Sequence, residues 1–337
     1  MKFDMDFNEI KQVAEEAIDN KEESQSYHEI EMEYAQLKYE FSHENIKFQQ
    51  YALEAYVNSK GDEDLYKSEI AIVSESFSEK AVNFFKRIWE IILKAFNSIK
   101  KFITDTAKSC KAKLEKVFKS VSKNKDFPPA KIDIGSLTLL TPDMEASDKI
   151  IAIDNIYKEV VGDAEFVLST KGAESLEKGV YRLKIEDLTD KINELYEHKK
   201  NNTNNIIEID FKTVDTFKKG IQEAFEKAAI IASEMTLRTE KVFDKYKKFM
   251  DDFYKKYPNA PSTIIKRSIT ELNNISETTG IPLKDLFCAH RIFMSSEKFM
   301  TVSNLTNKFF TDLFKDLNRF VNAIENLSKI MNEMKNE

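Results

Sequence analysis

The sequence predicts a mainly α protein, a bundle of long helices with minor β structure in the middle of the chain. Glycine and proline number only 7 and 6 among 337 residues, too few for the tight turns of a sandwich, a propeller or a doubly wound sheet. Apolar residues recur at three- and four-residue steps over long stretches, the spacing of one helix face. Hydrophobic residues form 42% and charged residues 32% of the chain, which excludes a membrane bundle and a typical disordered chain.

Charge divides the chain into three unequal blocks. Residues 1–79 hold 7 lysines and 20 acidic residues, a net charge of −13. Residues 80–125 hold 13 basic and 3 acidic residues, a net charge of +10. Residues 126–337 hold 31 basic and 35 acidic residues, a net charge of −4. An acidic arm therefore precedes a basic segment of almost matching charge, so either the two pair within the chain or each has an outside partner.

The first two segments are predicted to be helical. The acidic N-terminal arm, residues 1–77, has helical spacing over 6–19 and 27–58. The second segment, 78–125, is a basic amphipathic long helix whose apolar positions continue to residue 122. One straight helix and a hairpin broken near Thr104–Thr106 both fit this pattern, because a packed antiparallel pair would use the same apolar stripe.

The third segment, residues 126–337, is predicted to be a mostly helical domain that starts at Pro128-Pro129, where two prolines end the preceding helix. A few short strands are expected within about 131–210, and a helical bundle over 211–337. Extended runs are expected near 131–141, 165–169, 179–184 and 205–211, and helices over 144–161, 185–199, 211–257, 263–278, 282–294 and 296–335.

The sequence contains no recognisable catalytic or cofactor motif. It has no GxxxxGK[ST], GxGxxG, GxSxG or HExxH pattern. Cys110 and Cys288 lie far apart and are expected to be reduced, packed thiols, as in a chain made in the cytosol. No signal peptide or apolar run long enough to span a bilayer is present. We therefore predict a non-enzymatic protein with no cofactor, no metal site and no small-molecule substrate.

The clearest candidate site is the amphipathic stretch 80–102, which joins a large aromatic face to a basic one. Such a helix suits the core of a bundle, and it equally suits a membrane interface. The candidate membrane- or partner-binding face is Phe84, Phe85, Ile88, Trp89, Ile92, Phe96, Ile99 and Phe102. The candidate anionic-partner residues are Lys86, Arg87, Lys94, Lys100, Lys101, Lys108 and Lys111. Non-specific, strongly salt-dependent binding of nucleic acid would use the lysines of the second half, Lys100, Lys101, Lys108, Lys111, Lys113, Lys116 and Lys119.

Residues 84–96, FFKRIWEIILKAF, continuing into Ile99-Lys100-Lys101-Phe102, resemble a segment of virion structural and internal head proteins of large tailed bacteriophages. The resemblance covers about residues 70–122 only. It implies a protein made in the host cytoplasm and located in the virion, inside the head or associated with DNA ejection. It also implies cleavage by a head-maturation protease after glutamate, for which Glu75 in Val73-Ser74-Glu75 is the candidate.

Three functions follow as hypotheses. The first is a non-enzymatic structural or interaction protein of a bacteriophage virion, which docks helices against other virion proteins or against itself. The second is a membrane-perturbing helical effector or toxin, in which the 80–102 helix inserts after the acidic arm releases it. The third is a phage-encoded inhibitor that binds a host protein.

Overall fold

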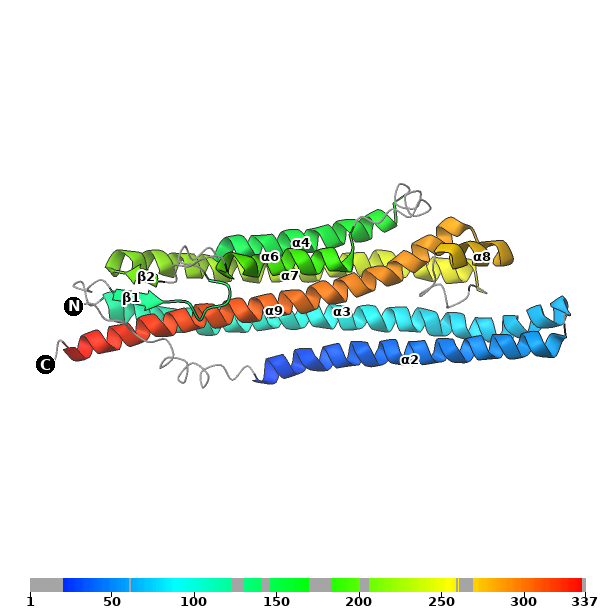
Figure 1. The fold of residues 1–337 in the computed structure, drawn as a ribbon, viewed down its shortest axis with the longest axis horizontal. Helices are drawn as coiled ribbons and strands as arrows, with labels where there is room; N and C mark the ends of the chain where they lie inside the picture. Colours follow the sequence, from blue (N-terminus) through cyan, green and yellow to red (C-terminus); the bar gives the residue numbers. More distant parts are fainter. Residues whose placement is uncertain are drawn as a thin grey trace.

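The computed structural model describes residues 21–60, 62–122, 130–140, 146–169, 183–200, 206–258, 260 and 269–334. Over these residues the protein is a mainly α helical bundle with a small two-stranded sheet, which confirms the predicted fold class. Its long helices run side by side along the long axis of the molecule (Figure 1). The helix expected over residues 6–19 lies outside the described residues.

The first two elements form a long helical hairpin. Helix α2 spans Lys21–Ser59 and α3 spans Glu63–Ser122. Between them Lys60 adopts a positive φ of 50°, and the Asp62 carboxylate accepts the backbone N–H of Leu65 at 3.1 Å. That bond satisfies one of the free N–H groups in the first turn of α3. At 60 residues, α3 is about 90 Å long.

Helix α3 is one continuous helix and begins earlier than predicted. The alternative hairpin broken near Thr104–Thr106 is wrong, because the Thr104 hydroxyl donates to the Lys100 carbonyl at 2.8 Å and the helix continues through this polar position. The predicted start at Ser78 is also wrong. The chain has no glycine or proline between Gly61 and Pro128, so nothing prevents the helix from starting directly after the turn.

The β structure is smaller than predicted. Strand β1, Ala130–Asp133, pairs antiparallel with β2, Ile206–Ile209, with Ala130 opposite Ile209. Of the run expected over 131–141, residues 134–140 form an irregular segment, and residue 141 lies outside the described residues. The N–H groups of this segment at Thr138, Leu139 and Leu140 donate to the Asp316 carboxylate rather than to a strand.

The strand expected near 165–169 is wrong, because helix α4 spans Ala146–Val167. Its buried positions at Val160, Ala164 and Val167 continue the helical three- and four-residue spacing to the last turn. Of the run expected near 179–184, only 183–184 lie within the described residues, and they form no strand.

Four more helices complete the described part of the fold: α6 (Ile185–Lys200), α7 (Phe211–Lys256), α8 (Ile269–Thr279) and α9 (Leu283–Met334). A capping box starts α7, in which Asp210 and Thr213 bond each other's backbone N–H groups. The break predicted at residue 295 is wrong, and α9 runs through it. The Ser296 hydroxyl donates a hydrogen bond to the Phe293 carbonyl at 2.6 Å, so the polar pair Ser295-Ser296 does not end the helix.

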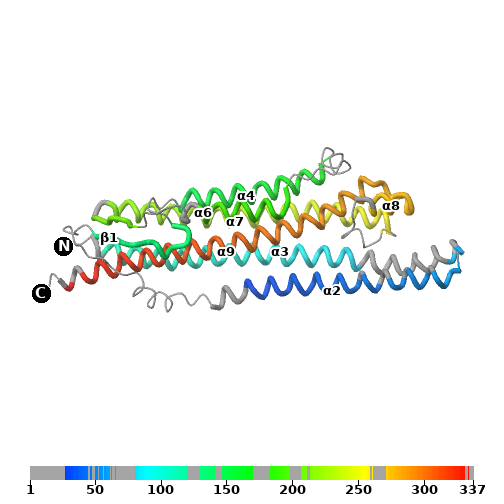
Figure 2. Tube along the Cα trace, viewed as in Figure 1, coloured from blue at the N-terminus to red at the C-terminus, as the bar shows by residue number. Residues whose placement is uncertain are grey.

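The central layer of the bundle is α3 with α9. Helix α2 lies on one side of this pair, and α4, α6 and α7 lie on the other (Figures 1 and 2). Buried side chains of α3 contact all three groups: Phe84 stacks on Phe41 of α2, Trp89 stacks on Phe243 of α7, and Phe102 meets Phe314 of α9 edge to face. The segment 78–122 is therefore the centre of the core.

Stability is expected to fall steeply above about pH 10. Burial raises the pKa of six described tyrosines above the ordinary value of 10, so they stay protonated in the folded protein while the unfolded chain loses those protons. A phenol whose pKa is higher in the folded protein than in the unfolded chain stabilises the fold below the unfolded pKa. This contribution falls as the pH rises further, by about 1.4 kcal/mol per pH unit for each well-buried phenol and by less for the partly exposed Tyr196. The tyrosines are Tyr27, Tyr34, Tyr157, Tyr196, Tyr246 and Tyr254.

Phenolate absorbance followed together with circular dichroism would measure this. We expect these six phenols, half of the twelve in the chain, to titrate only as helicity is lost. Full phenol titration at about pH 10 with the helices intact would contradict the expected burial. Lys298 has the opposite effect. Burial lowers its pKa, so its contribution to stability increases as the pH rises toward the pKa of lysine in the unfolded chain. The stability gained from this one lysine does not offset the stability lost from the six tyrosines.

Candidate functional site

The predicted aromatic face of α3 lies in the bundle core. All eight of its residues are buried, and the most exposed, Phe84 and Phe102, show 7% of their surface. Trp89 is fully buried among Phe243, Tyr246 and Phe299, with ring centroids 5.1–5.9 Å away. Burying side chains of this size contributes about 1.5–3 kcal/mol each. In this arrangement the face holds α2, α7 and α9 together and is not a free surface.

We expect Trp89 in the folded chain to be insensitive to membranes. Vesicles of anionic lipid carrying bromine-labelled acyl chains should leave its fluorescence unquenched, because the indole is fully buried. An isolated peptide of residues 80–102 is the positive control and should be quenched, since its aromatic face is then free to enter the interface. Quenching in the intact chain would contradict the packing of Trp89 and favour the membrane-perturbing hypothesis.

The first half of the basic segment pairs with acidic residues of the same chain. Three of its cations reach carboxylates of α2: Lys80 Nζ lies 2.7 Å from Glu44, Arg87 4.0 Å from Glu40, and Lys94 3.1 Å from Glu33. Lys86 pairs instead with Asp251 of α7 at 3.3 Å. Each pair is well exposed, so each contributes at most about 1 kcal/mol. Their regular order nevertheless fixes the antiparallel register of α2 along α3.

Four lysines further along the basic segment have no such cover among the described residues. Lys101, Lys108 and Lys111 are exposed and Lys100 is partly exposed, and within the described part of the chain none of the four has an ion-pair partner. Among the described side chains of α2, the ion pairs with α3 reach as far as Lys94, which pairs with Glu33. Charge pairing within the chain and a free basic surface therefore both occur, on successive halves of one helix.

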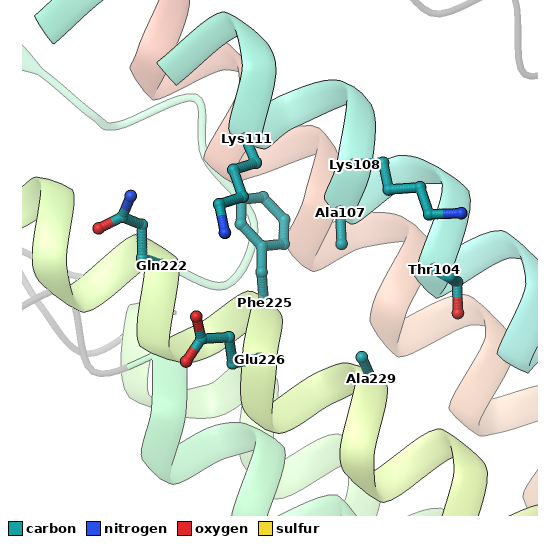
Figure 3. A pocket seen from close by; sticks show the side chains of 8 residues that line it. All are labelled: Thr104, Ala107, Lys108, Lys111, Gln222, Phe225, Glu226 and Ala229. Carbon is teal, nitrogen blue, oxygen red and sulfur yellow. The ribbon is translucent and has the colours of Figure 1, made fainter. Parts of the chain in front are cut away.

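A small apolar pocket lies beside these lysines, between α3 and α7 (Figure 3). It has a volume of about 200 Å³ and is open to solvent. Phe225 and the alanines Ala107 and Ala229 supply apolar surface, and Lys108 and Lys111 stand on the α3 side (Figure 3). The remaining lining residues are Thr104, Gln222 and Glu226. The arrangement suits an apolar side chain that is accompanied by negative charge.

The candidate cleavage residue Glu75 lies within α3, whose helical backbone runs through this position. Proteases bind their substrates as extended chains, so cleavage after Glu75 requires this part of α3 to unwind first. Cleavage at Glu75 stays a prediction.

Sequence reasoning missed the outward face of α2. Four large apolar side chains, Met32, Tyr39, Ile46 and Leu53, follow one another at seven-residue intervals and are 54–69% exposed. Val57 extends the stripe and is 64% exposed. The inward face of α2, with Tyr27, Leu37 and Phe41 buried, hid this second pattern because a sequence does not say which apolar stripe is covered.

A buried charged pair was also missed. Lys298 of α9 and Asp163 of α4 form an ion pair in the core, with 7% and 3% of their side-chain surface exposed. Burial lowers the pKa of Lys298, and the adjacent carboxylate opposes that shift. Tyr246 lies near the pair and bonds the Ala164 carbonyl at 2.9 Å and Ser295 at 3.1 Å. The only sequence signal was a charged residue at an apolar-face position of each helix.

The described residues offer little conventional reaction chemistry. Cys110 and Cys288 are both free and buried, and burial raises the pKa of each thiol to about 11, so neither is an activated nucleophile. Among the described residues no group of three or more His, Cys, Asp or Glu side chains is placed to hold a metal ion. Within the same residues no helix has the length and apolarity needed to cross a bilayer. No protein-family model, curated protein or solved structure matches the chain.

Proposed function

We propose that the protein is a non-enzymatic structural and interaction protein of a bacteriophage virion, which acts by docking helices. It is made in the host cytoplasm and packaged, either inside the head or with the proteins ejected alongside DNA. The virion assignment comes from the resemblance of residues 84–102 to virion structural and internal head proteins. The docking role comes from the surfaces of the α2–α3 hairpin.

The observation that carries the docking role is the unpaired outer surface of this hairpin. Its inner faces are used to build the core, while the stripe from Met32 to Leu53 and the lysines from Lys100 to Lys111 face outward. A surface helix normally turns polar side chains to solvent, so a heptad-spaced apolar stripe on its outer face favours contact with another helix. The free lysines favour an anionic partner, which is either an acidic protein or a nucleic acid bound without sequence preference.

Mass spectrometry of purified particles tests the proposal. The phage that encodes the chain would be purified, and the chain quantified against the major capsid protein. We expect many copies per particle. A chain abundant in infected cells but missing from particles would contradict the virion role. The intact mass from the same sample tests cleavage, since a chain starting at Ser76 supports Glu75 as the cut and a full-length mass excludes it.

The other two hypotheses have less support. A membrane-perturbing effector needs the aromatic face of α3, and that face is buried on α2, α7 and α9. An inhibitor of a host protein would use the same outer surfaces of the hairpin, and the particle measurement separates it from a virion component.

A further inference from the structure

Two free surfaces on this molecule have complementary chemistry. The first is the stripe on α2 made by Met32, Tyr39, Ile46 and Leu53, which we name the α2 stripe. The second is the pocket between α3 and α7 with Lys108 and Lys111 at its side, which we name the α3–α7 groove (Figure 3). One is apolar with acidic neighbours and the other is apolar with basic neighbours, so each supplies what the other lacks.

The α2 stripe has the features of a helix-docking face. Its exact seven-residue spacing is the repeat of side chains that enter a helical partner as knobs. Glu29 lies one turn before Met32, and Glu54 follows Leu53 directly. Both glutamates are exposed and have no ion-pair partner within the described residues. The nearby Glu33, Glu40 and Glu44 are already used by α3. Glu29 and Glu54, which do not pair with α3, therefore lie on the outer face.

The α3–α7 groove accepts such a face. Phe225 is only 5% exposed, yet with Ala107 and Ala229 it lines a cavity of about 200 Å³, room for one large apolar side chain. Lys108 and Lys111 are exposed and unpaired within the described chain, and Lys101 continues the basic row one turn away. Glu226 is the single carboxylate in the lining. The excess of lysines favours an acidic occupant.

A chain cannot fill its own groove with its own α2 stripe. The ion pairs of Glu33 with Lys94 and of Glu44 with Lys80 fix the stripe beside the first half of α3. The groove starts at Thr104, about 15 Å further along the helix from Lys94. The stripe also faces solvent and not α3. An α2 stripe that enters this groove must therefore belong to another molecule.

We propose that the occupant is a second copy of this chain, whose α2 stripe packs into the α3–α7 groove. Met32 enters the pocket beside Phe225, while Glu29, one turn before it on the same helix, approaches Lys108 and Lys111. Because the two surfaces differ, the contact is heterologous and each bound copy offers a new stripe and a new groove. Such contacts build rings or filaments and not closed dimers. The inference names a partner for the docking role and rests on that role.

Sedimentation velocity with two complementary variants tests the assignment. The stripe variant is Glu29→Gln/Met32→Ser/Ile46→Ser, which adds no positive charge, and the groove variant is Lys108→Glu/Lys111→Glu. Every substituted side chain is exposed, so both variants should fold, which circular dichroism and the unfolding midpoint would verify. The charge-matched control is Lys184→Glu/Lys255→Glu, two exposed lysines outside both surfaces.

We expect the wild-type chain and the control to associate beyond a dimer as concentration rises, more weakly at high salt. Each variant alone should associate roughly tenfold or more weakly. An equimolar mixture of the two variants should form a dimer and stop there, because one intact stripe meets one intact groove. That last result is specific to a heterologous contact.

Three results would overturn the proposal. A wild-type chain that stays monomeric at all accessible concentrations excludes self-association. Association that survives in the groove variant but is lost in the stripe variant assigns the stripe to another copy of α2. Loss of RNA or DNA binding in the groove variant, with monomeric wild type, assigns the lysines to nucleic acid. None of these depends on particle content, so a chain found in particles but monomeric in solution refutes self-assembly and leaves the virion role standing.

Discussion

Replacing Asp316 by alanine is expected to lower the free energy of unfolding by about 3–5 kcal/mol. This fully buried carboxylate on α9 accepts the backbone N–H groups of Thr138, Leu139 and Leu140 at 2.8, 2.5 and 3.0 Å. Alanine leaves those N–H groups without an acceptor in an apolar setting, and each unsatisfied donor is costly. Urea unfolding followed by helical circular dichroism would measure the loss.

Asp316→Asn is the matched control. It keeps the size of the side chain and one acceptor oxygen but removes the charge, so we expect a loss between zero and that of the alanine variant. Hydrogen exchange would locate the effect, with the 138–140 amides losing protection in the alanine variant first. An alanine variant within about 0.5 kcal/mol of wild type would show that Asp316 does not hold this segment.

Replacing Lys298 by methionine is expected to destabilise the fold by a similar amount, about 3–5 kcal/mol at neutral pH. The substitution keeps the length of the side chain but leaves the Asp163 carboxylate buried without its cation. Urea unfolding at pH 7.5, followed by helical circular dichroism, would measure the loss.

The double variant Asp163→Leu/Lys298→Met is the control for this pair. Removing both charges relieves the burial cost of each, so the double variant should recover most of the stability lost in the single one and can exceed wild type. A thermodynamic cycle on the four proteins gives the coupling energy directly. Additive losses from the two single substitutions would mean that the pair is not coupled in the folded protein.

These two polar contacts share a structural role. Asp316 joins α9 to the segment that leads out of β1, and Asp163–Lys298 joins α4 to α9. Apolar stripes of long helices tolerate sliding by a turn, whereas a buried charge fits only one register. Each contact therefore specifies how its helices align, the best-attested use of polar groups in helical cores.

The sequence by itself determined the helical class, the identity of the long helices and the apolar face from Phe84 to Phe102. These features follow from local spacing and from the scarcity of glycine and proline, and local spacing is readable from the chain alone. It predicted too many breaks, at Ser78 and residue 295, because a short polar run interrupts an apolar stripe without ending a helix.

Only the tertiary structure decided which apolar stripes are covered and which charged side chains form ion pairs within the chain. The face around Trp89 is buried while the stripe from Met32 to Leu53 is exposed, and both look amphipathic in sequence. Lys94 meets Glu33, whereas Lys108 and Lys111 meet no described acid, although all belong to one basic segment. Burial and pairing depend on neighbours far away along the chain, and a local pattern carries no record of those neighbours.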